Sequence, residues 1–459
     1  MKLSIRTNTI ALSLIAATAI PTYLLGQSQS QSKERHVHYK LIDLGTLGGT
    51  SSFFGSSIVT LNDSGEATGQ ADTPAANPFF PKELPILLDD PQIYHAFQWR
   101  DGVLTDLGAL PGGGDSAGIA INERGDIAGF SKNGTIDPYT GIPEIRAVLW
   151  KDGNLLDLGT LGGNESFTNS VNNRGQVAGF AQNDVIDPLN LFGLGTQSRA
   201  FLWDKGEIHD LGTLGGPDSF GFFVNGRGQV AGFSYTGSTT NLDTGLPTQH
   251  PFLWDKGVMK DLGTLGGTQV YAVNGLNNNG QVVGLMTLAG EKVFHGYLWD
   301  GRKLVDLGTF GGDTSAAIWL NDAGEVVGQA DYSTPCPGCV SPTIHKAFLW
   351  KDGVMSDLGT VDKCSAAYGI NSKTQIVGAS GDCGIAVHAF LWENGTIVDL
   401  NTLVPPDSGL QLVYGLYINE RGEIAGLGVP PGVPVQNVDS QGHAFLLVPC
   451  ERNDDACHR

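Results

Sequence analysis

The sequence has little positive charge, which narrows the partners it can bind. Only 27 of its 459 residues are Lys or Arg, against 47 Asp or Glu, and the formal net charge is −20. A surface with this excess of negative charge repels phosphate backbones and anionic lipid headgroups. The composition therefore argues against nucleic acid as a partner and leaves protein or glycan partners, cationic groups and divalent ions.

The sequence also has no apolar run long enough to cross a bilayer. Its longest apolar stretch, Ile10 to Ile20, follows Lys2 and Arg6 and is shorter than the roughly 20 residues of a spanning helix. A short apolar run behind positive charges is typical of a secretory signal peptide, whereas an uncleaved anchor is the alternative. We predict a signal peptide over residues 1–26, a linker over 27–38, a secreted or periplasmic protein, and no membrane span after cleavage.

Cysteines are absent from the first two thirds of the chain. All six occur near its end, at Cys336, Cys339, Cys364, Cys383, Cys450 and Cys457. An even number of cysteines behind a signal peptide predicts disulfides, which we expect to join Cys364 to Cys383 across one hairpin, Cys450 to Cys457 in a C-terminal tail (450–459), and Cys336 to Cys339 in a tight loop. The CPGC spacing also fits a redox pair or half a zinc site, but no second CxxC exists.

Glycine is abundant, and it recurs in a repeat. The segment DLGTLGG, or a variant of it, occurs eight times at spacings of 42 to 63 residues. Such periods are typical of propellers and solenoids. The eight copies begin at Asp43, Asp106, Asp157, Asp210, Asp261, Asp306, Asp357 and Asp399.

Two turn signals alternate within each repeat. One is Asn-x-x-Gly before a β-branched run, as at Asn277 to Gly280, and it suits a type I turn followed by a strand. The other is Asp-Gly, or a relative of it, between two apolar runs, as in Ala347 to Gly359, and it is a strong hairpin cue. Each repeat therefore holds four strands: a (AFLW), b (ending DLG), c (ending at the turn Asn) and d (QVVG).

Four antiparallel strands in about 50 residues match one blade of a β-propeller, so we predict an all-β fold with eight four-stranded blades over residues 39–449. A recurring tryptophan on strand a is expected to pack as a core residue between blades. These tryptophans are Trp99, Trp150, Trp203, Trp254, Trp299, Trp350 and Trp392.

The two ends of the repeat region complement each other. The first repeated segment supplies strand b alone (Tyr39 to Asp43), and the last supplies strand a alone (His443 to Leu447). Pairing these strands would complete the eighth sheet and close the ring, removing the exposed edges of an open array. Strand c, with small residues such as Ser315 to Ala317, is expected to line the centre.

A basic residue recurs at the start of strand a, and we expect it to contact the strand-b aspartate in every blade. The basic residues are His95, Arg146, Arg199, His250, His295, Lys346, His388 and His443. Because these groups are spread around the ring, repetition argues against a shared catalytic or metal centre.

These residues resemble the extracellular HAF-repeat family, named for a His-Ala-Phe triplet found here at His95 to Phe97, His388 to Phe390 and His443 to Phe445. The DLGTLGG and Asn-x-x-Gly-Gln-Val-x-Gly elements fit the same pattern. The resemblance covers roughly residues 39 to 448 and implies a bacterial exported repeat protein without an established activity.

The connections from strand d to strand a differ between repeats, so we expect binding sites there. The longest, roughly Ala71 to Tyr94, carries the apolar candidates Phe79, Phe80 and Tyr94, which suit either a contact patch or a loop that folds back over the ring. Three further connections carry the candidates Asp137 and Tyr139, Asp187, and Asp243, which suit either turns or acidic loops that bind calcium or a partner.

We therefore predict a monomeric, secreted binding or scaffold protein that engages a protein or glycan at the cell surface through one face. The sequence shows no nucleophile elbow, HExxH zinc motif or Asp-x-Asp-x-Asp-Gly calcium loop, so no catalytic residue and no cofactor are assigned. The alternative is a propeller hydrolase or lyase with its site at the channel mouth.

Overall fold

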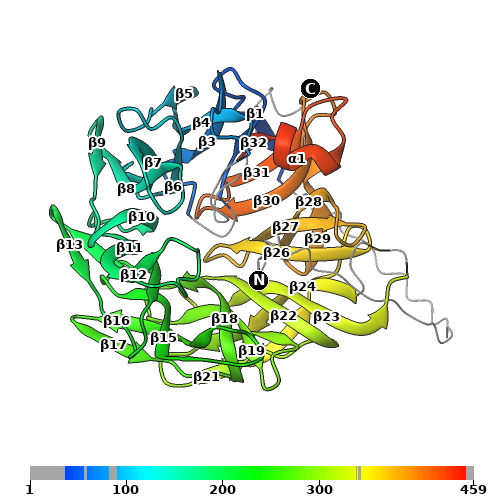
Figure 1. Cartoon of the computed structure of the whole chain (residues 1–459). Helices are drawn as coiled ribbons and strands as arrows, with labels where there is room; N and C mark the ends of the chain where they lie inside the picture. The colour runs from blue at the N-terminus through cyan, green and yellow to red at the C-terminus, as the bar shows by residue number, and fades with distance from the viewer. Residues whose placement is uncertain (1–36, 56–58, 82–89, 338, 340–342, 451–459) are drawn as a thin grey trace.

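The chain folds as an eight-bladed β-propeller (Figure 1). The structure, a computed structural model, describes residues 37–55, 59–81, 90–337, 339 and 343–450. Within them, eight antiparallel sheets of four strands each surround a common centre. The fold predicted from the repeat is confirmed, whereas the predicted signal peptide and nearly all of the linker and tail lie outside the described residues.

Every blade has the strand order c-d-a-b from the centre outward. The c strands are β2 (Ser52–Phe53), β6 (Ser116–Ile121), β10 (Gly162–Val171), β14 (Ser219–Val224), β18 (Gly266–Leu276), β22 (Gly311–Leu320), β26 (Cys364–Ile370) and β30 (Gln411–Ile418). The d strands are β3 (Ala67–Ala76), β7 (Ile127–Ile136), β11 (Val177–Ile186), β15 (Val230–Thr240), β19 (Val282–Leu288), β23 (Val326–Pro335), β27 (Ile376–Gly381) and β31 (Ile424–Val429).

The two outer strands of each blade form the Asp-Gly hairpin. The a strands are β4 (Gln92–Arg100), β8 (Pro143–Lys151), β12 (Thr196–Asp204), β16 (Pro247–Asp255), β20 (Phe294–Trp299), β24 (Thr343–Lys351), β28 (Ala386–Glu393) and β32 (His443–Pro449). The b strands are β5 (Val103–Asp106), β9 (Asn154–Asp157), β13 (Glu207–Asp210), β17 (Val258–Asp261), β21 (Leu304–Asp306), β25 (Val354–Asp357), β29 (Thr396–Asp399) and β1 (Tyr39–Asp43). Blades 1 to 8 are numbered by their c strands.

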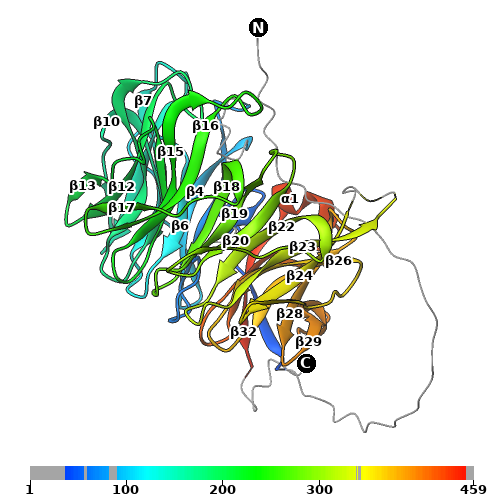
Figure 2. The ribbon, with the colours of Figure 1, turned by 90° about the horizontal axis from the view of Figure 1, so that it is seen from below.

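Helical structure among the described residues is confined to the connections of the last blade. The 3-10 helix η1 (Leu400–Thr402) leads into β30, and η2 (Val435–Asn437) and α1 (Val438–Gln441) lie between β31 and β32. The c strands of neighbouring blades contact one another, so the expectation that strand c lines the centre is confirmed. Seen from the side, the strands run between the two faces of the ring (Figure 2).

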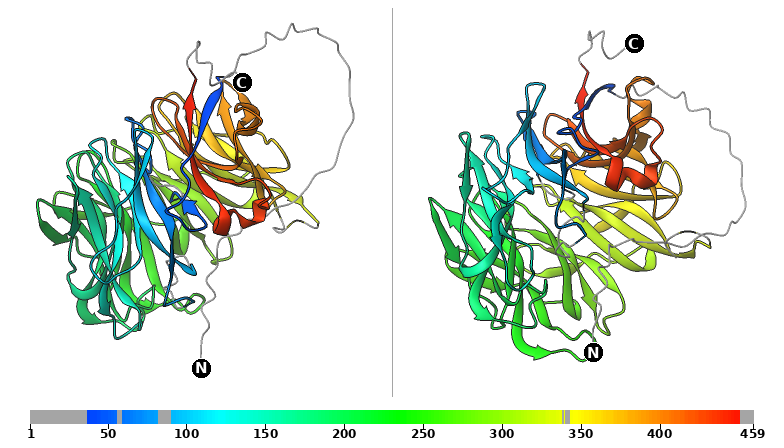
Figure 3. Two further views of the ribbon diagram at one scale, coloured as in Figure 1. Left: turned by 90° about the horizontal axis from the view of Figure 1, so that it is seen from above. Right: turned by 45° about the horizontal axis from the view of Figure 1, so that its top comes forward.

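The eighth blade is built from both ends of the described chain. β1 pairs with β32 in antiparallel register from Tyr39 opposite Pro449 to Asp43 opposite Phe445, and the two strands lie side by side in Figure 3. The His443 Nδ1 atom lies 3.0 Å from an Asp43 carboxylate oxygen across the same junction. The predicted closure of the ring is therefore confirmed.

Local turn chemistry explains the hairpins. Asp352 at the a–b turn of blade 6 has φ 52° and the next residue, Gly353, has φ 84°. Two successive positive φ angles define the primed turn that suits the twist of a β-hairpin, and Asp-Gly or Asn-Gly tolerates it best. Corresponding pairs occur at Asp101-Gly102, Asp152-Gly153, Lys205-Gly206, Lys256-Gly257 and Asn394-Gly395.

The Asn-x-x-Gly turns form a closed belt of hydrogen bonds between blades. In each blade the turn asparagine donates from Nδ2 to the backbone carbonyl of the equivalent asparagine in the next blade, at 2.9–3.1 Å. The belt runs through Asn62, Asn122, Asn172, Asn225, Asn277, Asn321, Asn371 and Asn419 and returns to Asn62. The same residues thus shape the turn and join the blades.

A second repeated contact joins the opposite ends of the strands. Near the start of strand c, a serine hydroxyl accepts a hydrogen bond from the backbone N–H of strand a in the preceding blade at 2.9–3.0 Å. The serines are Ser52, Ser116, Ser166, Ser219, Ser315 and Ser365. These serines satisfy amide groups that a buried blade interface would otherwise leave unpaired.

The core lies between blades, and within each blade the strand-a aromatics pack against glycines of strand d. Phe252 is fully buried, and a Cβ at Gly232 would lie 1.9 Å from the Phe220 carbonyl and 2.8 Å from the Phe252 ring. The glycine that ends the QVxG pattern is therefore required by close packing. The seven repeated tryptophans all join interblade apolar clusters, and Trp150 and Trp299 are buried there, which confirms their predicted core role.

Candidate functional site

The two faces of the ring differ in their connections. The short c–d and a–b hairpins lie on one face, which we call the hairpin face, and the b–c and d–a connections lie on the other, which we call the variable face. The d–a connections of blades 1 and 8 are the longest, and those of blades 1 to 4 contain most of the binding candidates. A ligand site that differs from blade to blade is therefore expected on the variable face.

An aromatic plug narrows the centre of the ring toward the hairpin face. The ring centroids of Phe223 and Trp319 are 5.9 Å apart, and those of Trp319 and Tyr417 are 6.3 Å apart. These residues come from the late part of strand c in blades 4, 6 and 8, which are not neighbours, so they meet across the centre.

A hollow of about 720 Å³, which we call the aromatic hollow, opens on the blade 3 to 5 side of the centre. Phe192 and Asp243 reach it from d–a connections, and Phe222 and Tyr271 reach it from c strands. Behind it, Phe167, Phe180, Phe220 and Phe233 form a continuous series of ring contacts. Its lining is mostly apolar, as is usual for pockets that bind small molecules.

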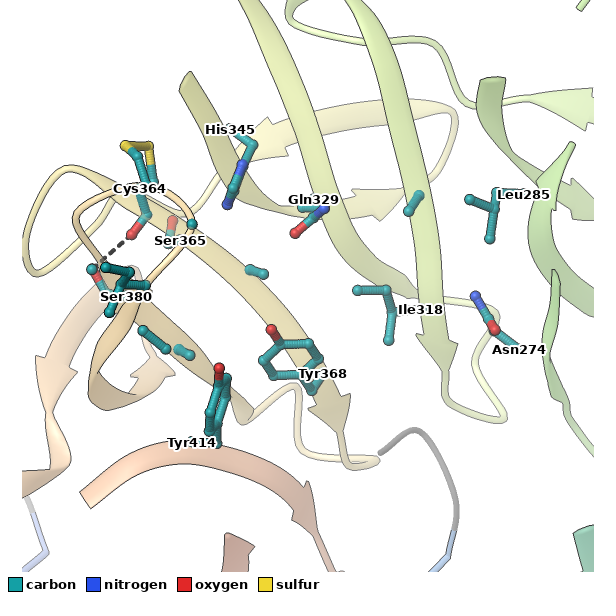
Figure 4. Close-up of a pocket in the computed structure, with 18 of the residues that line it drawn as sticks. Asn274, Leu285, Ile318, Gln329, His345, Cys364, Ser365, Tyr368, Ser380 and Tyr414 are labelled. Atoms are coloured by element: carbon teal, nitrogen blue, oxygen red, sulfur yellow. Dashed lines mark hydrogen bonds between the residues drawn. A yellow bond between two sulfur atoms is a disulfide. The ribbon is translucent and has the colours of Figure 1, made fainter. Parts of the chain in front are cut away.

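A second hollow of about 360 Å³, which we call the tyrosine hollow, lies on the blade 6 to 8 side. Gln329, His345, Tyr368 and Tyr414 turn toward one space in Figure 4, beside the Cys364–Cys383 disulfide. Both hollows are lined by Ala272 and Asn274 of β18, so they adjoin along this strand. Neither hollow could be located from the sequence, because strands of non-adjacent blades form the walls.

The apolar candidates of the first d–a connection have separate locations. Phe80 is 46% exposed, and Phe79 packs partly buried against the main core cluster. Tyr94 is 1% exposed, so of the two alternatives it does not belong to a surface contact patch. Strands β3 and β4 extend further into this connection than expected, and this extension places Tyr94 in the sheet.

Asp137 and Asp187 are buried, which excludes them as exposed contact residues. Asp137 accepts hydrogen bonds from the backbone N–H groups of Tyr139 and Thr140, and Asp187 accepts one from Leu189. Both carboxylates therefore shape their own turns, the alternative that the Asp-Pro pattern left open.

Tyr139 and Asp243 are exposed as expected, at the tips of the blade 2 and blade 4 connections. The candidate aspartates do not join into one cation site, because the one group of three potential metal ligands among the described residues consists of cysteines.

Two further carboxyl groups lie buried at blade junctions and were not singled out in the sequence. Burial raises the pKa of Glu165 to about 8 and that of Asp218 to about 7, and the nearby Asp137 and Asp187 respectively raise each pKa further. One oxygen of each group has no hydrogen-bond partner among the described residues. Both groups are thus largely protonated in weakly acidic solution.

The expected contact between strand a and the strand-b aspartate occurs with the five histidines. In these blades Nδ1 lies 2.8–3.0 Å from the aspartate, in the pairs His95–Asp106, His250–Asp261, His295–Asp306, His388–Asp399 and His443–Asp43. Arg146, Arg199 and Lys346 instead bond to Glu144, Gln197 and the Lys363 carbonyl, so the prediction is wrong for these three blades. Glu144 and Gln197 lie two residues earlier on the same strand, and Lys363 lies in the b–c connection.

The cysteines form disulfides, as predicted. Cys336 joins Cys339, Cys364 joins Cys383 across the c–d hairpin of blade 7, and Cys450 is disulfide-bonded. The expected partner of Cys450, Cys457, lies outside the described residues. Since the sulfur atoms of Cys336, Cys339 and Cys383 lie within 4.8 Å of one another, the first two disulfides stand side by side.

No helix among the described residues has both the length and the apolar character needed to cross a bilayer.

No protein-family model matches the chain, and no curated protein matches its sequence. Solved propellers resemble its structure. The β-propeller domain of the trilobed protease from Pyrococcus furiosus is 9% identical, with a TM-score of 0.42, over 79% of this chain and 98% of that domain. The acylaminoacyl peptidase of Pyrococcus horikoshii is 11% identical, with a TM-score of 0.40, over 86% of this chain and 58% of the peptidase. The likeness concerns the propeller fold alone.

Proposed function

We propose that the protein is a secreted binding propeller that docks a protein partner on the loop tips of blades 2 to 4. The observation that carries the proposal is a group of exposed apolar side chains in these d–a connections and at the ends of the d strands that lead into them. Leu242 is fully exposed, Ile186 is 70% exposed and Tyr139 is 55% exposed, and Ile136, Val185 and Leu189 are also exposed. Exposed apolar groups gathered in one region are typical of protein interaction sites.

The loop tips are held in place before any partner arrives. The Tyr139 ring packs against Gly195 of the next connection, so the loops of blades 2 and 3 touch. Asn164 donates to Asp137 across the same junction, and Asn241 donates to Thr268 at the junction of blades 4 and 5. Rigid loops lose little conformational entropy on binding, which favours affinity.

The chemistry of the tips favours a protein over a glycan. Aliphatic Leu242, Ile186 and Leu189 offer no hydrogen bonds, whereas recognition of a sugar requires polar groups beside aromatic rings. Exposed Asp184 and Asp243 flank the apolar side chains. The partner surface is therefore expected to have an apolar centre and a basic rim, and the net charge of −20 would strengthen such an encounter at low salt.

Function outside the cytoplasm is part of the proposal. Disulfides persist in oxidising compartments, and five of the six cysteines are disulfide-bonded in the structure. Cell fractionation of the producing organism, with thiol alkylation before lysis, tests this step. Recovery of the protein in the cytoplasm with reactive thiols would contradict it.

The docking test compares two triple variants of the full mature protein. One replaces Tyr139, Ile186 and Leu242 by Ser on the variable face. The matched control replaces Val103, Val258 and Val354 by Ser, which are 59–67% exposed on the hairpin face. A partner isolated from the cell envelope with the wild-type protein is purified, and its affinity for each variant is measured by biolayer interferometry.

The proposal predicts at least a tenfold loss of affinity for the loop-tip variant and no loss for the control. Equal affinity of the two variants would contradict the docking surface. If binding survives protease digestion of the envelope fraction but is lost after glycosidase treatment, the partner is a glycan and not a protein.

A further inference from the structure

The tyrosine hollow has no charged side chain in its lining, although the chain has 74 Lys, Arg, Asp and Glu residues in total. Its walls come from blades 5 to 8 and combine small apolar residues with hydroxyl, amide and imidazole groups. At about 360 Å³ it lies at the lower end of the range for small-molecule sites, roughly 300–1,000 Å³. A charged ligand would lose its hydration there without gaining a counter-charge from the lining, and the Asp439 carboxyl, which lies close enough to raise the pKa of Tyr368 and Tyr414, would repel an anion further.

His345 is the most informative group in the lining. It is 8% exposed, it lies on β24, and its Nδ1 atom has no hydrogen-bond partner among the described residues. Burial, together with the neighbouring Lys346, lowers its pKa to about 4, so the imidazole is neutral near pH 7. A neutral imidazole has one donor and one acceptor, and a buried polar atom without a partner is costly unless a ligand or water completes it.

Two tyrosines face His345 from the other side of the hollow. Tyr368 on β26 and Tyr414 on β30 are in edge contact, with ring centroids 6.1 Å apart. Burial raises the pKa of Tyr414 to about 12, so its hydroxyl remains a donor. Figure 4 shows both hydroxyl groups and the Gln329 amide turned into the same space as His345.

We propose that the tyrosine hollow binds an uncharged saccharide unit of one or two rings. The neutral lining excludes charged ligands, the mixed donors and acceptors of His345, Gln329 and the tyrosine hydroxyls match a polyhydroxylated ligand, and the tyrosine rings offer apolar contact to its C–H faces. Entry is from the variable face, since the aromatic plug narrows the opposite end. This site is separate from the loop tips and does not depend on the proposed protein partner.

The charge of the ligand is the variable that tests the proposal. Isothermal titration calorimetry of the full mature protein compares glucose, maltose and N-acetylglucosamine with their charged relatives glucosamine and glucuronate. The expected result is millimolar or tighter binding of at least one neutral sugar and at least tenfold weaker binding of both charged analogues. No binding of any neutral probe, or equal binding of a charged analogue of the same size, would overturn the proposal.

Variants locate the binding in the hollow. Tyr368→Phe keeps the ring and removes the hydroxyl, and His345→Leu removes the unpartnered nitrogen. Each is expected to weaken binding at least fivefold. The matched control is Tyr332→Phe, because the Tyr332 hydroxyl bonds to Asp357 away from the hollow. If sugar binding is unchanged in both hollow variants, the site lies elsewhere.

A comparison with a polysaccharide shows whether the ligand is a free sugar or the end of a glycan chain. Soluble amylose and the free disaccharide maltose present the same sugar unit. A preference for maltose supports a free sugar as the ligand, and a preference for amylose supports the end of a glycan chain. If a hollow variant fails to fold, the charge series on the wild-type protein still decides the proposal.

Discussion

Replacing one asparagine of the interblade belt should destabilise the whole ring. Asn225 is 5% exposed, and its Oδ1 accepts from the backbone N–H groups of Arg227 and Gln229, both at 3.0 Å. Its Nδ2 donates to the Gln229 side chain at 2.8 Å and to the Asn277 carbonyl at 3.0 Å. Asn225→Ala removes four hydrogen bonds, each with a net value of about 0.5–1.5 kcal/mol.

Because Arg227 is exposed and can be solvated by water, the expected loss in the free energy of unfolding is about 2–4 kcal/mol. Asn225→Asp keeps both accepted bonds but turns a buried carboxylate oxygen toward the Gln229 side-chain oxygen and the Asn277 carbonyl oxygen, so it should cost at least as much as Asn225→Ala. The matched control is Asn154→Ala, since Asn154 is exposed and bonds only within its own turn. Urea unfolding followed by tryptophan fluorescence measures all three. If Asn225→Ala unfolds at the same urea concentration as Asn154→Ala, the belt does not stabilise the ring.

Three further predictions concern stability. Thr374 has φ 59°, at the position where the other belt turns have glycine. Thr374→Gly should therefore raise the free energy of unfolding, measured in urea titrations, by about 1 kcal/mol minus the contribution of the lost hydrogen bond to Glu325. Thr374→Ala should not raise it. The raised pKa values of Glu165 and Asp218 mean that the folded protein holds protons which the unfolded chain releases, so the free energy of unfolding should fall as pH rises from about 4 to about 8. A Glu165→Gln, Asp218→Asn double variant should reduce this pH dependence when unfolding is measured at several pH values. An unchanged pH dependence would contradict the raised pKa values. Replacing Cys364 and Cys383 by Ser should lower the free energy of unfolding by about 3 kcal/mol for a loop of 19 residues, and calorimetric unfolding identical to wild type would show that this disulfide does not constrain the chain.

The sequence predicted the blades well because each hairpin is determined by the residues of its own turn and strands. The Asp352-Gly353 pair has the two positive φ angles that its residue types favour, so the hairpin follows from adjacent residues. Closure of the ring also followed, because the missing strand at each end was visible as a gap in the repeat. The link between Asp43 and His443 then required only pairing of the two strands.

The site was harder to predict because burial depends on neighbouring blades. Asp137 lies in an Asp-Pro turn that resembles an exposed loop, yet the adjacent blade covers it and Asn164 bonds to it. Likewise, the unpartnered nitrogen of His345 indicates a binding site only because Tyr368 and Tyr414, which are on other blades, line the same hollow. The acceptors of the asparagine belt are backbone carbonyl groups, which no side-chain pattern marks.

The pairing of β1 with β32 has a consequence for biosynthesis. The Asp43 and His443 side chains that meet there are 400 residues apart, and the belt bond between Asn419 and Asn62 spans 357 residues. A chain that folds from its N-terminal end completes every other blade before β32, the partner of its first strand, is available. Until then the early blades have an open edge that can pair with strands of other chains. Protection of that edge by a chaperone during folding would raise the yield of native protein.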